Sequence, residues 1–84
     1  PAIGSGTKQY VQVGAFSDLG AARRLRERLQ EITSLPVFIQ DVVSSSTQRL
    51  HRVRVGPILT GEEIQLVTER VVAANLGSPY TVTE

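Results

Sequence analysis

A four-residue pattern occurs twice in this chain, and this repeat limits the possible folds more than any other sequence feature. Val11-Gln12-Val13-Gly14 recurs as Val53-Arg54-Val55-Gly56, 42 positions further along. The same offset relates three pairs of apolar residues: Ala22 to Ile64, Leu25 to Val67, and Leu29 to Val71. In both copies a short alternating strand meets a Gly, which is expected to form the turn into a helix. The chain is therefore interpreted as two copies of one strand–helix unit.

The first copy predicts a strand and then a helix. Residues 8–14 alternate between polar and apolar positions, as a half-buried strand does. Ser17 precedes the helical pattern, and its hydroxyl is expected to accept a hydrogen bond from a free amide of the first turn. The apolar residues that follow at helical spacing are Ala21, Ala22, Leu25, Leu29 and Ile32. The arginines of this segment lie mostly off that stripe and are interpreted as a solvated face.

The second half of the chain predicts two strands, another helix and a last strand. Residues 37–43 and 48–56 are the strands, and the polar residues 44–47 form a hairpin connection between them. Thr60 and Glu63 have the spacing of a capping box at the start of the helix. Gly77 and Pro79 are expected to end that helix. Its apolar positions are Ile64, Val67, Val71 and Leu76. Residues 80–83 form the last strand.

The order β-α-β-β-α-β defines the fold class. Two split βαβ units in this order predict an α+β, ferredoxin-like or RNP-like fold, with a four-stranded antiparallel sheet and both helices on one face. The strands at residues 8–14 and 48–56 are expected side by side at its centre. The repeated valines should face the helices. The uncovered face should then present Tyr10, Gln12, Gly14, Leu50, Arg52 and Arg54.

The available side chains argue against catalysis, metal binding and cofactor binding. The chain has no Cys and a single His, which excludes thiolate chemistry and multi-His metal sites. That residue, His51, is expected to be a partly buried structural residue. Asp18 and the Glu62–Glu63 pair fall in first helical turns, where acids complement the helix dipole. A non-enzymatic domain with no metal and no cofactor is expected.

Charge and hydropathy limit the kinds of partner. Nine Lys and Arg stand against eight Asp and Glu, so the basic excess typical of nucleic-acid binders is missing. No apolar run is long enough to insert into a membrane. Residues 1–6 lack the features of a signal peptide and are interpreted as a tail before a domain at 7–84. The start at Pro1 suggests a segment of a longer protein, and the domain is expected to be monomeric.

Two longer motifs resemble a known family. Residues 9–17 (QYVQVGAFS), followed by Ala21, Ala22 and Leu25, are similar to the opening motif of the SPOR (sporulation-related repeat) family. Residues 52–57 (RVRVGP) resemble its second signature, at the family's usual separation. The resemblance extends over about residues 7–83. The chain departs from some relatives at Ala15, where they have Ser, and at Leu50, where they have an aromatic residue.

The resemblance implies a domain that binds peptidoglycan glycan strands (GlcNAc–MurNAc) stripped of their stem peptides. It also implies a location in the bacterial periplasm and cell envelope, enriched at the division septum. The implied contacts, on the open sheet face and its rim, are Gln12, Gly14, Ala15, Phe16, Ser17, Asp18, Leu19, Leu50, Arg52, Arg54, Tyr80 and Val82. Within the family the chain is similar to the C-terminal domain of an outer-membrane lipoprotein whose lytic transglycosylase domain is separate, which implies an outer-membrane anchor for the parent protein.

Two expectations follow from the chemistry of such a ligand. Gln12 can both donate to and accept from a sugar hydroxyl. Removing a stem peptide turns an amide at the muramic lactyl group into a free carboxylate, which Arg52, Arg54 or the amides of residues 17–19 are expected to recognise. The alternative is a protein-interaction module that docks a cell-division or envelope partner on the open sheet or its edge.

Overall fold

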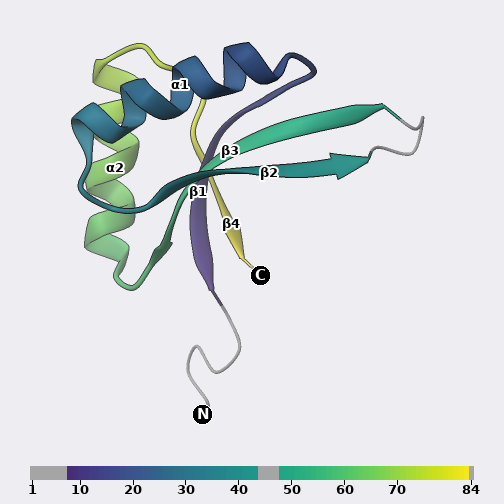
Figure 1. Ribbon diagram of the computed structural model, residues 1–84. Coiled ribbons are helices and arrows are strands. Elements are labelled where there is room, and N and C mark those ends of the chain that lie inside the picture. Colours follow the sequence, from purple (N-terminus) through teal and green to yellow (C-terminus); the bar gives the residue numbers. More distant parts are fainter. Residues whose placement is uncertain (1–7, 44–47, 84) are drawn as a thin grey trace.

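The computed structural model describes residues 8–43 and 48–83 and contains six elements in the predicted order. They are β1 (Gln9–Phe16), α1 (Leu19–Ile32), β2 (Val37–Val43), β3 (Arg49–Ile58), α2 (Gly61–Ala73) and β4 (Tyr80–Thr83). The strands form one antiparallel sheet in the order β2-β3-β1-β4, with β1 and β3 at its centre as predicted (Figure 1). The expected tail at 1–6 and hairpin connection at 44–47 lie outside the described residues.

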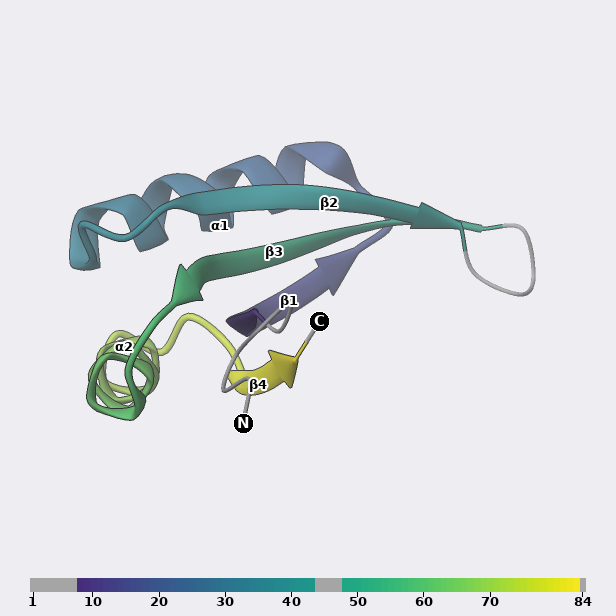
Figure 2. The same cartoon turned by 90° about the horizontal axis from the view of Figure 1, so that it is seen from below.

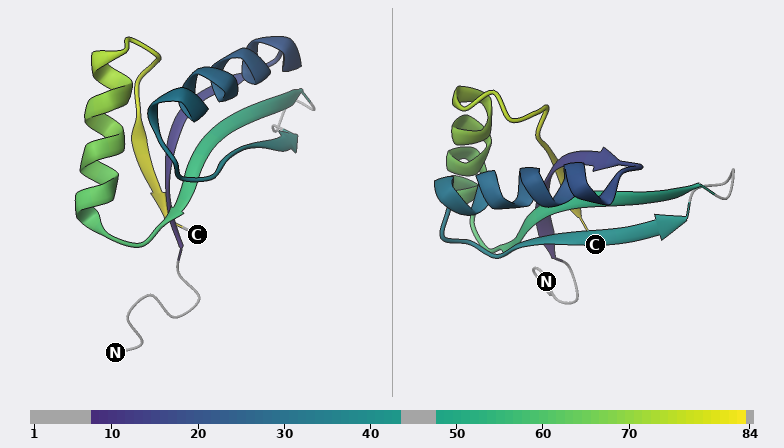
Figure 3. Two further views of the ribbon diagram at one scale, coloured as in Figure 1. Left: turned by 60° about the vertical axis from the view of Figure 1, so that its left-hand side comes forward. Right: turned by 45° about the horizontal axis from the view of Figure 1, so that its top comes forward.

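Both helices pack against one face of the sheet. α1 contacts β1, β2 and β3, and α2 contacts β1 and β3 beside it (Figures 2 and 3). The repeated valines of β1 and β3 are at most 4% exposed and pack against Ala22, Leu25 and Leu29 of α1 and Val67 and Val71 of α2. The predicted core is therefore confirmed at the repeated valines and at the predicted helix positions except Ala21, which is half-buried and lies outside the core cluster. In the described part of the chain neither helix, of 14 and 13 residues, has the length and apolar character that a membrane span requires.

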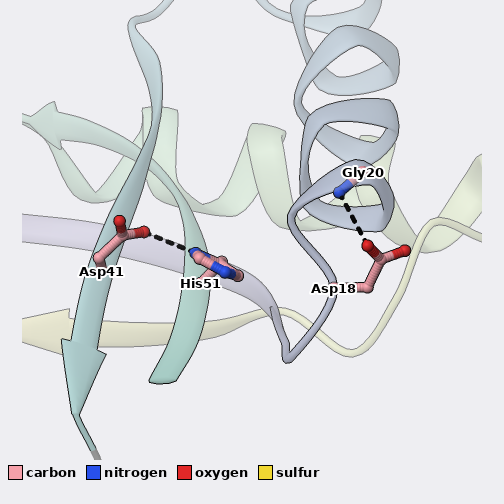
Figure 4. Close-up of polar contacts among 4 residues, drawn as sticks. All are labelled: Asp18, Gly20, Asp41 and His51. Carbon is pink, nitrogen blue, oxygen red and sulfur yellow. Dashed lines mark hydrogen bonds and ion pairs between the residues drawn. The ribbon is translucent and has the colours of Figure 1, made fainter.

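α1 begins one residue later than predicted. Asp18, not Ser17, is the N-cap, and its carboxylate accepts a hydrogen bond from the Gly20 amide at 3.1 Å (Figure 4). Both residue types are good caps. The prediction of Ser17 was wrong because the helix starts at Leu19, which places the extended backbone of Asp18 at the cap position.

α2 begins as predicted and ends earlier. The Thr60 hydroxyl accepts a hydrogen bond from the Glu63 backbone amide at 3.1 Å and donates one to the Glu63 carboxylate at 3.2 Å. These contacts confirm Thr60 as the N-cap, with the Glu63 side chain reaching back to it. The helix ends at Ala73 and not at Gly77, because Asn75 adopts a left-handed conformation with a φ of 56°. Leu76 therefore packs on the core from the segment after the helix.

The pairing of β1 with β3 contains two register shifts, and each lies beside one glycine of the repeat. One falls between Gln9 and Val11, opposite Gly56, and the other between Gln12 and Gly14. Such bulges let both strands continue past the glycines, so the expected strand-to-helix turns at Gly14 and Gly56 were wrong. Gly56 has a φ of +140°, a backbone conformation that residues with a side chain rarely adopt.

The second bulge reverses the orientation of the end of β1. Gly14 pairs with the core residue Val53, and a Cβ atom added to Gly14 would lie 2.8 Å from the Phe16 ring and 3.3 Å from Leu25. Gly14 therefore faces the helices, and its predicted place on the uncovered face was wrong. The reason is that strict alternation fails where a strand carries an extra residue.

Candidate functional site

A chain of hydrogen bonds crosses three strands on the uncovered face of the sheet. Arg54 Nε donates to Gln12 Oε1 at 2.9 Å, and Gln12 Nε2 donates to the Tyr80 hydroxyl at 2.7 Å. The backbone register explains the contact, because Gln12 of β1 pairs directly with Arg54 of β3 and with Tyr80 of β4. Directly opposed residues share a face of the sheet. We call these three residues the Gln12 network.

Burial differs sharply within the Gln12 network. Arg54 is 2% exposed and Gln12 is 4% exposed, whereas Tyr80 is 56% exposed. Neither buried residue lies beneath a helix, since both alternate with the core valines along their strands. Only Tyr80 offers the network a large accessible surface, so a ligand on this face meets Tyr80 before the other two.

Two aromatic rings extend the network toward β2. The Tyr10 and Phe38 rings meet edge to face, with centroids 5.6 Å apart and an interplanar angle of 75°. The guanidinium carbon of Arg54 lies 5.9 Å from the Tyr10 ring centroid, within range of a cation–π interaction. Phe38 pairs with Arg54 across β2 and β3. Each of the four strands thus contributes a side chain to one cluster.

A second row of residues lies beside the network on the same face. Arg52, which is half-buried, pairs with Ala15 of β1 on one side and with Gln40 of β2 on the other. The Oε1 atom of Gln40 is buried and accepts no hydrogen bond from the described residues. Two further predicted residues, Leu50 and Val82, are half-buried and share this face by register.

The remaining predicted site residues lie elsewhere. Gly14 and Phe16 face the helices, and Phe16 packs against the core. The corner between β1 and α1 consists of Ser17, Asp18 and Leu19. There the Asp18 carboxylate already accepts from the Gly20 amide (Figure 4). The same carboxylate also lies 3.9 Å from the Arg24 guanidinium. The structure therefore divides the predicted site into an open-face group and a corner group.

His51 lies on the helix side of β3, opposite Phe16. It is 7% exposed, and its Nδ1 atom is 2.7 Å from the Asp41 carboxylate (Figure 4). These contacts agree with the structural role expected from the sequence. Across residues 8–43 and 48–83, no group of three or more His, Cys, Asp or Glu side chains is arranged to hold a metal ion.

Sequence reasoning missed Phe38 and Gln40 as members of this surface. Both lie on β2, which was predicted as a strand at residues 37–43, but its register against β3 was not assigned. That register, which pairs Phe38 with Arg54 and Gln40 with Arg52, is the missing signal. Tyr10 was expected on the open face but was not included among the binding residues.

Comparison with known proteins adds three findings. Residues 5–83 match the SPOR domain family. The chain is 45% identical over 73 residues to "Endolytic peptidoglycan transglycosylase RlpA" from the Pseudomonas aeruginosa strains UCBPP-PA14 and PAO1, an alignment that covers 87% of this chain and 21% of each relative. The crystal structure of the RlpA SPOR domain from Pseudomonas aeruginosa superposes with a TM-score of 0.84 at 44% identity, covering 88% of this chain and 96% of that one. The chain thus spans about a fifth of the length of these curated relatives.

Proposed function

This chain belongs to the SPOR domain family, and from that premise we propose that it binds peptidoglycan through glycan strands from which the stem peptides have been removed. The chain is a SPOR domain over nearly its whole length and is therefore a binding domain and not an enzyme, as the sequence predicted. The name of the curated relatives, a peptidoglycan transglycosylase, supports peptidoglycan as the polymer.

The single observation that carries the proposal is the polar and aromatic cluster on the uncovered sheet face. Glycan strands present many hydroxyl groups and little apolar area, so they suit a shallow surface with hydrogen-bonding groups and an exposed ring. Tyr80 is 56% exposed and offers both a hydroxyl group and an aromatic ring. The buried Gln12 amide donates a hydrogen bond to the Tyr80 hydroxyl and so fixes its position. The helices occupy the other face, so a ligand reaches this cluster without displacing the core.

Recognition of the missing peptide requires a group that reads the new lactyl carboxylate. Arg52 is the better candidate of the two arginines, because Arg54 is 2% exposed and already donates to Gln12. The corner amides at Ser17–Leu19 are less suited to an anion, since the exposed Asp18 carboxylate lies there and accepts from Gly20. We therefore assign the charge-reading role to Arg52.

The expected setting follows from this ligand. Peptide-free glycan is a bacterial cell-wall polymer, so the parent protein is proposed to be a cell-envelope protein in the periplasm. Its proposed enrichment at the division septum rests on the family resemblance. Resemblance to RlpA further suggests a parent that carries a lytic transglycosylase domain and an outer-membrane anchor. In such a protein this domain serves to place the enzyme on its polymer.

Pull-down by purified sacculi tests the proposal. Wild-type domain should be enriched on amidase-treated sacculi relative to untreated ones, and Gln12→Ala should lose that enrichment because Tyr80 loses its support. Gln30→Ala, on the exposed surface of α1, is the matched control and should behave as wild type. Absence of wild-type binding when no other protein is added would favour the alternative, a protein-interaction module.

Titration separates the two arginines. Arg52→Ala should reduce the preference for peptide-free over peptide-bearing strands by about ten-fold, the size expected for one charge-assisted hydrogen bond. Arg54→Ala should weaken binding to both kinds of strand, because it disturbs the whole network. An Arg52→Ala domain with unchanged preference contradicts the charge-reading role.

A further inference from the structure

We propose that Gln12 is a positioning residue that fixes the Tyr80 hydroxyl as a hydrogen-bond donor toward the ligand. The inference rests on the proposed function of the open face and identifies the ligand group that this face favours, an oxygen that accepts a hydrogen bond. In this arrangement Tyr80 is the residue that touches the sugar, and Gln12 acts through it.

The direction of the network is set by Arg54. A guanidinium group only donates hydrogen bonds, so the Gln12 atom 2.9 Å from Arg54 Nε must be the amide oxygen. The amide nitrogen of Gln12 then faces Tyr80 at 2.7 Å. Because that nitrogen only donates, the Tyr80 oxygen must accept. The polarity of all three groups therefore follows from one residue whose side chain can only donate hydrogen bonds.

The consequence is a hydroxyl hydrogen directed away from the sheet. The Tyr80 oxygen makes no hydrogen bond to a residue of 8–43 or 48–83 other than Gln12. Since Tyr80 is 56% exposed, its hydrogen is available to a ligand on the open face. Gln12 at 4% exposure cannot offer its own amide to a sugar in the same way.

A donor with a fixed direction discriminates between ligand groups. It favours oxygen acceptors, and above all a carboxylate, which has no hydrogen to offer and binds hydroxyl donors strongly. A stem peptide replaces that carboxylate with an amide, whose oxygen is a weaker acceptor and whose N–H group is itself a donor. Tyr80 therefore contributes to the preference for peptide-free glycan, beside Arg52.

The isosteric exchange Gln12→Glu reverses this polarity. The Glu carboxylate accepts from both Arg54 and Tyr80, so the Tyr80 hydroxyl donates inward and presents only lone pairs to the ligand. Peptide-free glycan strands, prepared by amidase digestion of sacculi, are the probe. Gln12→Glu and Tyr80→Phe should each weaken binding by about ten-fold, and the double variant should lose no more than the stronger single variant. Gln30→Glu, a charge-matched exchange on exposed α1, should bind as wild type.

Each result decides between the hypotheses. Wild-type affinity in Gln12→Glu, or additive losses in the double variant, would show that Gln12 does not set the Tyr80 hydroxyl and would overturn the inference while leaving the proposed function intact. Failure of the wild-type domain to bind the strands overturns the proposed function and the inference with it. Thermal unfolding checks that the variants fold. If Gln12→Glu does not fold, Gln12→Met is the substitute variant, because it removes the amide that donates to Tyr80 without adding charge. Gln12→Met should bind more weakly than wild type. Unchanged affinity in this variant would also overturn the inference.

Discussion

The two copies of the Val-x-Val-Gly pattern lie side by side in the sheet, and they agree in packing but differ in polar chemistry. Val11 pairs with Val55 and Gly14 with Val53, and all four repeated valines are at most 4% exposed against the helices. The middle residues, Gln12 and Arg54, pair with each other on the opposite face. The apolar positions thus repeat because both halves share one core, whereas the middle positions differ and build the candidate site.

Equivalent core positions of the two helices should show the largest effects. Leu29 of α1 and Val71 of α2 are related by the repeat, and each is 0% exposed. Leu29→Ala should lower the free energy of unfolding by about 3 kcal/mol and Val71→Ala by about 2 kcal/mol, because each leaves a cavity in the shared core. Urea denaturation measures both. A loss under about 1 kcal/mol at one site only would show that the two halves do not share the core equally.

The glycines of the two copies should differ. Gly56→Ala should cost about 2 kcal/mol of unfolding free energy, because its φ of +140° is strained for any side chain and its added Cβ would lie 3.1 Å from backbone atoms. Gly14→Ala should cost about 1 kcal/mol, since the Phe16 ring that blocks it can shift. Equal costs, measured by chemical denaturation, would contradict this distinction between strain and crowding.

The helix caps should show the smallest effects. Asp18→Ala and Thr60→Ala should each lower the melting temperature by an amount that corresponds to about 1 kcal/mol, because each removes an acceptor for a free helix amide. Ser17→Ala is the matched control for the first helix and should change stability by less than about 0.5 kcal/mol. If Ser17→Ala lowered stability more than Asp18→Ala, Ser17 and not Asp18 would be the N-cap of α1.

Periodicity in the sequence was sufficient for the architecture of this domain. The repeat, the two apolar helical stripes and the alternating strands predicted six elements, their order and the core valines, all of which the structure contains. The helix ends were predicted less well, because Ser17 and Asp18 are both suitable caps and Asn75 can leave the helical conformation before Gly77. Which of two neighbouring residues caps or ends a helix depends on small differences in local free energy, because both residues can adopt the required conformation.

The sequence by itself determined the element order, the shared core, the uncovered face and the place of Gln12 and Arg54 upon it. Only the tertiary structure decided that the bulge before Gly14 turns Gly14 and Phe16 toward the helices, that Phe38 and Gln40 join the face, and that Gln12 is buried behind Tyr80. The physical reason is that period-two alternation is a property of one strand, whereas register and bulges belong to a pair of strands. Side chains from positions 12, 54 and 80 meet only after that pairing is set.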